Sequence, residues 1–371
     1  MDRPTGRVYT SENRWAGRHR WVGLLILCTL LSCEKTTAAV AVPPPHAAPV
    51  PLDMPGPGRN RGDLMATRNA ECEACHPVEA AEWRASLHKR ADTEPTYRRA
   101  FDIEPLPFCR SCHAPEADPN EPESTQLAAL GVGCVTCHIT NGEILAAPWT
   151  QSYPPPPAPH AVAREPQFTT ASACANCHEF GFPGTRGMEM HEKMQATITE
   201  NALLSTPARP CAECHMSAGT RGQKSHTFSA SRDPVAMARA VIVEAERVSM
   251  STVHIRLIPG EVGHAFPTGD LFRRVEVAVE VEGPDHMSLN SEYRYLTRHF
   301  EPRRHGAGRQ LVRDDRILGK AVTLTFNLGE AAEGRSITYR VSYQRVEHPN
   351  GVDESDAVVD GELVLAHGRL L

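Results

Sequence analysis

One five-residue pattern, Cys-x-x-Cys-His, occurs five times between residues 72 and 215. Two thiols at this spacing can each add to a vinyl group of a haem, and the adjacent histidine can then bind the iron as the proximal ligand. Composition alone would give about 0.02 copies of the pattern in this chain. The repeats therefore predict five covalently bound c-type haems, each with its iron. The residues are Cys72, Cys75 and His76; Cys109, Cys112 and His113; Cys134, Cys137 and His138; Cys174, Cys177 and His178; and Cys211, Cys214 and His215.

Two other uses of paired cysteines fit this pattern less well. Structural zinc is also bound by Cys-x-x-Cys pairs, but it does not require a histidine directly after every second cysteine. Five isolated disulfides are a weaker alternative still. An export signal at the N-terminus also argues against a zinc ribbon, because such ribbons are typical of cytosolic proteins.

The N-terminus has the pattern of that export signal. Basic residues precede a short apolar run, residues 21–32, which is too short to span a bilayer and suits the core of a signal peptide. The run ends in Leu30-Leu31-Ser32-Cys33, which resembles a bacterial lipobox with Cys33 as the acylated residue. The alternative is an ordinary secretory signal in which Cys33 is incidental. We expect residues 1–33 to be a signal peptide with a lipobox, and the mature protein to be a membrane-anchored lipoprotein, periplasmic or on the outer surface.

Composition bounds the remaining classes. The 371 residues are 40% hydrophobic, enough for two domains, but only 6% are aromatic and 31 are proline. The core of the motif region is therefore thin, and porphyrin faces could supply the missing apolar surface. A net charge of −6 gives no reason to expect nucleic acid as a partner.

The character of the chain changes three times along its length. Residues 34–61 are rich in proline and should form an extended linker. Residues 62–233 contain all five motifs, with helices expected at 78–90 and 188–204. From residue 234 cysteine is absent and β-branched residues alternate, which predicts strands at 240–248, 252–258, 274–281, 292–299, 321–328, 337–346 and 362–366. The expected fold is multidomain α+β: a loop-rich, partly helical cytochrome domain over 62–233, then a small antiparallel β-sandwich over 234–371.

Five further histidines are candidates for the second, distal ligand of an iron. One follows the first motif, one precedes the fourth, one lies on the helix expected at 188–204, one follows the fifth motif, and one lies at the start of the β region. From the residues alone, each is either an iron ligand or a surface residue. The candidates are His88, His160, His191, His226 and His264.

The flanks of the motifs resemble the broad family of bacterial multihaem c-type cytochromes that includes the tetrahaem electron acceptor of ammonia oxidisers. The matching pieces are W-x-x-S-x-H, CRSCHAP, GVGCVTCH, PH ahead of ACANCHEF, MQATITE leading into CAECHM, and KSHTF. The resemblance implies that His88, His160 and His226 are distal ligands. GHAFPTG resembles a motif at the start of the β region in related proteins, which favours His264. Pentahaem nitrite reductases carry a C-x-x-C-K motif, whereas all five motifs here end in histidine.

Three functions agree with these features. The first is an electron carrier on the periplasmic or cell-surface side of a membrane, with redox partners such as a membrane dehydrogenase or other cytochromes, and with the membrane contacted through Cys33. The second is a multihaem oxidoreductase in which one haem is left open to act on a small nitrogen or sulfur compound. The third is a scaffold subunit whose β region docks a partner. We expect the carrier, without catalytic residues, because five proximal and five distal histidines balance.

Overall fold

The computed structural model of the chain describes residues 61–122, 125–150, 157–183, 193–219, 223–304, 309–349 and 351–371. The expected signal segment with Cys33, nearly all of the proline-rich linker, and His191 lie outside these ranges. Among the described residues, no helix is both long and apolar enough to cross a bilayer.

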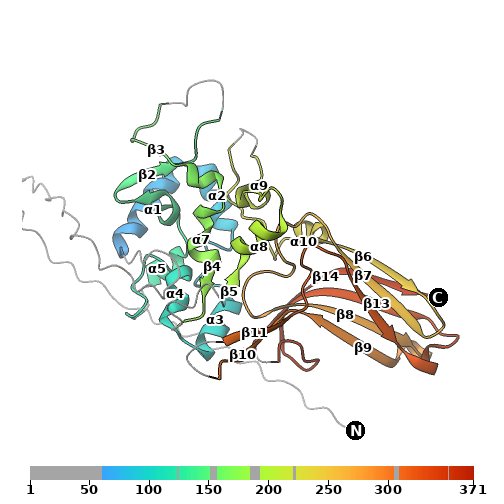
Figure 1. Cartoon of the computed structure of the whole chain (residues 1–371). Helices are drawn as coiled ribbons and strands as arrows, with labels where there is room; N and C mark the ends of the chain where they lie inside the picture. The colour runs from blue at the N-terminus through green and yellow to red at the C-terminus, as the bar shows by residue number, and fades with distance from the viewer. Residues whose placement is uncertain are drawn as a thin grey trace, which may run out of the picture. The chain divides into compact units, whose positions relative to one another are not determined.

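Short helices and strand pairs make up the motif region (Figure 1). Prolines stand at the start of α2, α3 and α4, where the missing N–H costs no hydrogen bond and the fixed φ suits a helix. The helices are α1 Asp63–Cys75, α2 Pro77–Ala85, α3 Pro95–Ile103, α4 Pro107–His113, α5 Thr125–Leu130, α6 Cys134–His138, α7 Ser172–His178, α8 Thr197–Leu204 and α9 Cys211–His215, with the 3-10 turn η1 Pro166–Thr169. The strands are β1 Ile139–Thr140, β2 Glu143–Ala146, β3 Ala163–Arg164, β4 Glu179–Gly181 and β5 Lys193–Ala196.

Both helices expected in this region are shorter than predicted. The helix expected at 78–90 ends at Ala85, because Ser86 is extended and its hydroxyl donates to the carbonyl of Trp83, 2.7 Å away. The helix expected at 188–204 begins only at Thr197, after β5, which pairs antiparallel with β4. Glu179, the first residue of β4, accepts the amides of Ile198 and Thr199. The first residue of α8 is therefore determined by a carboxylate that lies 19 positions before Ile198 in the sequence.

The β region contains two antiparallel sheets, in the strand orders β12-β7-β6 and β14-β13-β8-β9. Each of the seven expected strands overlaps an observed one, and the sequence missed an additional hairpin, β10–β11. A short helix, α10 Pro234–Ala240, precedes the first strand. The strands are β6 Val241–Arg247, β7 Thr252–Pro259, β8 Arg273–Glu282, β9 Ser288–Leu296, β10 Arg298–Pro302, β11 Arg309–Asp314, β12 Val322–Asn327, β13 Ile337–Val346 and β14 Val359–Leu370, with the 3-10 turns η2 Pro284–His286 and η3 Gly329–Ala332.

The two sheets share one apolar core. Alternate residues of β8, from Val275 to Val281, are fully buried and pack against Ile255 and Leu257 of β7 and Phe326 of β12. Each such side chain contributes about 1.5–3 kcal/mol on burial. The fold class predicted from the sequence, multidomain α+β with an antiparallel sheet region at the C-terminal end, is confirmed.

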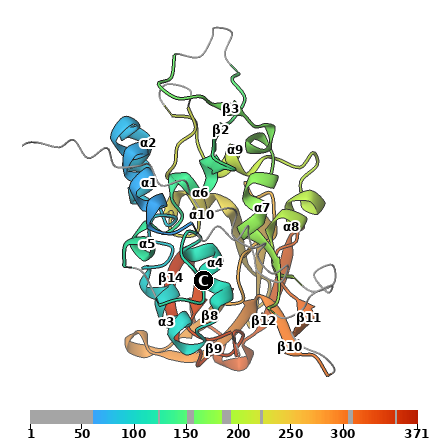
Figure 2. The same ribbon diagram turned by 90° about the vertical axis from the view of Figure 1, so that its left-hand side faces the viewer.

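Polar contacts join the motif region to the β region, and Figure 2 shows the ribbons of both regions from a second side. Arg298 of β10 donates to the carbonyls of Lys193 and Met194 in β5, over 3.1 and 2.6 Å. Arg316 is paired with Glu200 of α8 at 2.8 Å, and the hydroxyl of Thr268 donates to the same carboxylate at 2.6 Å. The loop that carries His264 is therefore held against α8.

Candidate haem-binding sites

Every motif histidine lies at the end of a short helix. We number the sites 1 to 5 in chain order. The helices α4, α6, α7 and α9 end on the histidine itself, and His76 follows α1 directly. The two cysteines and the histidine of each motif are therefore placed by one turn of backbone. The site histidines are, in order, His76, His113, His138, His178 and His215.

Backbone carbonyls orient three of these rings. The Nδ1 atoms of His113, His138 and His215 lie 2.6, 2.7 and 2.6 Å from the carbonyl oxygens of Ala91, Leu145 and Ser229. Nδ1 must be protonated to donate to a carbonyl, so Nε2 is the nitrogen that keeps its lone pair for a metal. At site 4 the side-chain amide of Gln195 lies 3.1 Å from Nδ1 of His178.

Four of the five site histidines face a second histidine. The ring centroids are 6.4 Å apart for His76 and His160, and 6.2 Å apart for His138 and His226. They are 6.3 Å apart for His178 and His88, and 6.2 Å apart for His215 and His264. These second histidines are four of the five candidates from the sequence.

This separation matches two imidazoles on opposite faces of one metal ion. A metal–imidazole bond is about 2 Å long, and the ring centre lies about 1 Å beyond the nitrogen, so two rings bound to one metal are about 6 Å apart. Direct stacking would bring the rings closer. The donor set therefore fits a six-coordinate haem iron at sites 1, 3, 4 and 5.

Helix α2 and its flank position two of the second histidines. Trp83 donates its indole N–H to the carbonyl of Val132 at 2.8 Å, and the amide of Val132 donates to the carbonyl of His88 at 2.9 Å. Gly131 has a φ of +60°, and a Cβ there would lie 2.5 Å from the carbonyl oxygen of His88. The segment from Trp83 to His88 therefore packs against Gly131 and Val132, which precede the third motif. Glu82, also on α2, accepts the amide of His226 at 2.8 Å.

Site 2 differs from the other four. The ring of Tyr97, on α3, stacks on His113 with centroids 3.7 Å apart and planes 7° apart. Among the described residues, no histidine faces His113 at the distance seen in the other pairs. The remaining sequence candidate, His191, lies outside the described residues. Sequence reasoning missed Tyr97, because nothing in E-P-T-Y marks it as a neighbour of a motif that begins twelve residues later.

Electrostatics keep several of these imidazoles uncharged. Burial and then the neighbouring His178 and His113 lower the pKa of His88 to about 3. Although part of the His178 side chain is exposed, desolvation by the surrounding protein and then His215 lower its pKa to about 4. Burial is also the main cause that lowers the pKa of His113, His138, His226 and His264. Neutral imidazoles can bind a metal without first losing a proton.

The motif thiols differ in their electrostatic environment: the hydrogen bond with Cys174 lowers the pKa of Cys211 to about 7, whereas other thiols are held in the neutral form. Burial raises the pKa of Cys109 to about 11 and that of Cys134 to about 12, whereas zinc binds thiolates. All ten motif cysteines are free thiols in the structure. Within the described ranges, no three His, Cys, Asp or Glu side chains group as they would around one metal ion.

The five sites are neighbours of one another. Cys174 of site 4 and Cys211 of site 5 are hydrogen-bonded, and His178 is close enough to His215 and His113 for both to lower its pKa, after desolvation. Asn69, next to the first motif, accepts the amide of Cys134 at 2.7 Å and so joins sites 1 and 3. Haems held at these motifs would form one connected group.

Comparisons with known proteins agree with this geometry. The sequence profile of the family "Cytochrome c554 and c-prime" matches residues 71–139, which contain the first three motifs. No curated protein matches the chain. The chain is similar in fold to a penta-heme cytochrome c552 from Thermochromatium tepidum, with a TM-score of 0.63 and 15% identity over 84% of this chain and 99% of that one. Together with the five motifs, these findings support a multihaem c-type cytochrome, with covalently bound c-type haem.

Proposed function

We propose that this protein carries electrons through five covalently attached haems. The observation that carries the proposal is the set of four histidine pairs with ring centroids 6.2–6.4 Å apart. A bound haem supplies an iron that changes oxidation state, and two histidines on one iron leave no position for a substrate. The cysteines would attach the porphyrin ring, and the histidine pairs would give the iron the same two ligands before and after its oxidation state changes.

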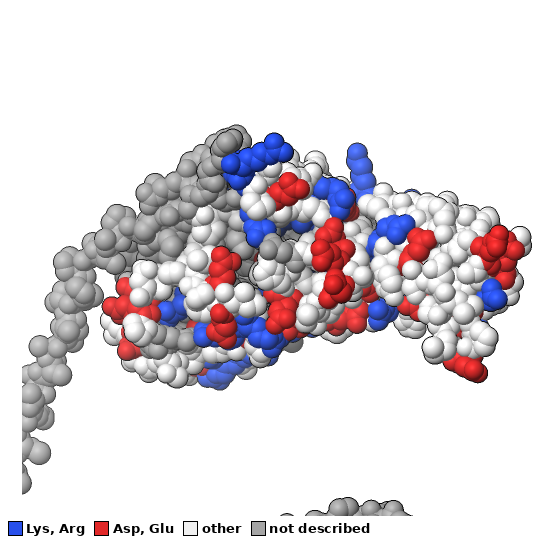
Figure 3. Space-filling view, turned by 90° about the horizontal axis from the view of Figure 1, so that it is seen from below, with Lys and Arg blue, Asp and Glu red and all other residues white. Residues whose placement is uncertain are grey.

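Export and anchoring belong to the same proposal. The family match is to a class of exported proteins, and the lipobox ending at Cys33 favours a lipoprotein on the periplasmic or outer face of a membrane. On the face shown in Figure 3, acidic and basic side chains are interspersed, so that face does not present a single charge to a redox partner. Labelling with a radioactive fatty acid should mark the wild type but not Cys33→Ala. Release of unlabelled wild type into the periplasmic fraction would contradict the anchor.

A second function, an oxidoreductase with one open haem, is favoured by a single observation. His113 is stacked on Tyr97, and none of the described histidines faces it. If His191 does not reach site 2, that iron has a free position at which a small nitrogen or sulfur compound could bind.

Electron paramagnetic resonance of the purified holoprotein tests both functions. A carrier in which every haem iron has two protein ligands should give only low-spin ferric signals, and its reduced form should not bind carbon monoxide rapidly. His191→Ala should then produce one high-spin haem, while the exposed His367 provides a matched control, because His367→Ala should change no haem signal. A high-spin signal in the wild type, together with turnover of hydroxylamine or nitrite, would replace the carrier with the oxidoreductase.

A further inference from the structure

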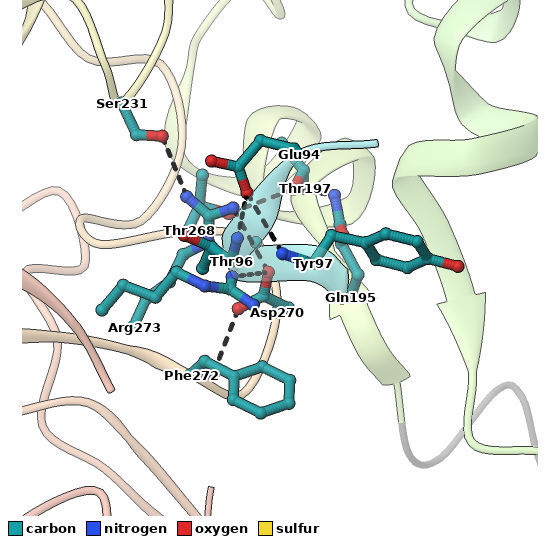
Figure 4. A network of polar contacts seen from close by, with 12 residues as sticks. Glu94, Thr96, Tyr97, Gln195, Thr197, Ser231, Thr268, Asp270, Phe272 and Arg273 are labelled. Atoms are coloured by element: carbon teal, nitrogen blue, oxygen red, sulfur yellow. Dashed lines mark hydrogen bonds and ion pairs between the residues drawn. The ribbon is translucent and has the colours of Figure 1, made fainter. Parts of the chain in front are cut away.

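A cluster of charged side chains from the β region lies beside sites 2 and 4. Arg273, on β8, donates to Asp270 at 3.2 Å, and Arg345, on β13, donates to the same carboxylate at 3.0 Å. The guanidinium of Arg273 also donates to Ser231 at 3.1 Å and to the hydroxyl of Tyr343. Figure 4 shows Arg273 joined to both Asp270 and Ser231.

Contacts along the chain connect this cluster to site 2. Ser231 is followed by Arg232, which pairs with Glu94 at 2.6 Å and contacts Thr96 at 3.2 Å. The carboxylate of Glu94 caps α3 by accepting the amides of Thr96 and Tyr97. Tyr97 in turn stacks on His113. This series of contacts connects the cluster to the site 2 histidine through the start of α3.

The same cluster acts electrostatically on two site histidines. After desolvation and then His215, Arg273 is the next cause that lowers the pKa of His178. At His113, where burial is again the main cause, Asp270 and Arg345 act in opposite directions on the pKa. Contacts also connect the cluster to site 4: the side-chain amide of Gln195, beside His178, lies 3.4 Å from the hydroxyl of Thr197, which is 3.1 Å from that of Thr268, close to Asp270 in the chain.

The charges of the cluster do not balance. Two guanidinium groups, those of Arg273 and Arg345, share the single carboxylate of Asp270. The neighbouring acidic groups already have partners, because Arg232 pairs with Glu94 and Arg316 pairs with Asp314 and Glu200. A further arginine, Arg298, donates to a backbone carbonyl and adds positive charge close to Asp314 and Glu200. Arg273 and Asp270 are each 24% exposed, and Arg345 is 17% exposed. Excess positive charge in such a setting is unfavourable unless an anion accompanies it.

Two donors of the cluster are also unused. The Nε atoms of Arg273 and Arg345 are enclosed and have no hydrogen-bond partner among the described residues. The position of Arg273 is closely fitted, because Gly269 has a φ of +106° and a Cβ there would lie 2.8 Å from that Nε. An excess of positive charge suits an acceptor that carries negative charge, and the guanidinium fork matches the geometry of a carboxylate.

We propose that Arg345 and Arg273 bind haem propionates at sites 2 and 4. The β region would then complete two haem sites that contain none of its own cysteines or iron ligands. This inference rests on the proposed function, because it requires haem at both sites. The arginines are positioning residues, which hold the edge of the ring and place positive charge near the iron.

Redox titration of the holoprotein tests the proposal. Arg273→Gln and Arg345→Gln should each lower the midpoint potential of one haem, because a lost positive charge favours the oxidised iron. They should also shift the propionate bending bands in the resonance Raman spectrum. Arg256→Gln is the matched control, since Arg256 is 50% exposed and pairs with Glu244 on the surface of the β region. It should leave both readouts unchanged.

The outcomes separate this inference from the proposed function. A wild-type mass without five haems would overturn the proposed function. Five haems with unchanged potentials and Raman bands in both glutamine variants would overturn only the arginine assignment. If a glutamine variant does not fold, Arg273→Lys and Arg345→Lys keep the charge, and they should shift the Raman bands while largely keeping the potential. A spectral change of the wild type on adding sodium nitrite, lost in Arg273→Gln, would assign the cluster to a free anion instead.

Discussion

The two regions of this protein are stabilised in different ways. In the β region, aliphatic side chains from both sheets interdigitate, and Val275, Val277, Leu257 and Phe326 are fully buried. In the motif region the buried apolar cluster is small and lies between residues 65 and 139. Among the described residues of 157–219, Phe182 is the one large apolar side chain that is buried, with 7% of its surface exposed. Sites 4 and 5 are therefore organised around histidines and polar contacts rather than around a protein core.

We infer from this difference that haem contributes to the folding of the motif region and not to that of the β region. Below a certain core size, small units need metals, disulfides or cofactors to offset the conformational entropy of folding. The porphyrin rings would supply the apolar surface that the motif region lacks, whereas the β region already has its own.

The largest expected effect follows from withholding haem. Protein made without haem attachment should lose the helical structure of residues 62–233, which a protease should then digest, and leave a resistant fragment beginning near residue 234. Circular dichroism should show a sheet spectrum for that fragment and for residues 234–371 expressed alone. Full helical content in the haem-free protein would show that the two regions do not differ in this way.

The second effect belongs to the core of the β region. Phe326→Ala removes a fully buried ring and should lower the free energy of unfolding by about 3–5 kcal/mol. Ile242→Ala is the control, because Ile242 of β6 is 54% exposed, and it should change the free energy of unfolding by about 0.5 kcal/mol or less. Urea unfolding followed by the sheet signal measures both, and equal losses would mean that the core does not carry the stability of this region.

The third effect concerns the histidine that links the regions. His264 lies in the β region but faces His215 at 6.2 Å. His264→Ala should convert one of the five haems to high spin and weaken the contact between the regions, so that they unfold at separate temperatures. The exposed His367 is again the control. A variant with an unchanged haem spectrum and a single unfolding transition would make His264 a packing residue.

Much of the contrast between the motif region and the β region could be predicted from the sequence, because it depends on patterns of neighbouring residues. The Cys-x-x-Cys-His repeats fix the proximal ligands within five residues, and alternating valines such as Val277 and Val279 mark β8. The pairing of histidines is not local. His88 follows the first motif by twelve residues yet faces His178 of the fourth, and only tertiary contacts such as Trp83 with Val132 bring them together.

The errors have the same physical origin. Residues 193–196 read as helix but form β5, because β4 offers them a pairing partner and the carboxylate of Glu179 starts the helix later. Arg273 and Arg345 sit in strands whose pattern reports only which face is buried. A charged residue in such a pattern carries no sign of the distant site that it approaches.

The smallest expected effect lies at the junction itself. Asp233 caps α10 by accepting the amides of Val235 and Ala236 at 2.9 and 3.2 Å. Its pKa is lowered, first by a hydrogen bond from the Ser229 hydroxyl and then by the Ala236 amide. Asp233→Ala should cost about 1 kcal/mol, whereas Asp233→Asn should cost little because asparagine caps equally well.

The pH dependence of this cap distinguishes it from a general effect of mutation. Because the folded pKa lies below the unfolded value of about 3.9, the charged cap stabilises fully above that value and is lost as the pH falls through the folded pKa. The difference in unfolding free energy between wild type and Asp233→Ala should therefore be constant from neutral pH to about 5 and shrink in stronger acid. Urea titrations over this range measure it. Since the carbonyl of Ser229 also orients His215, a change in the site 5 spectrum of Asp233→Ala would show that the junction connects the two regions rather than merely separating them.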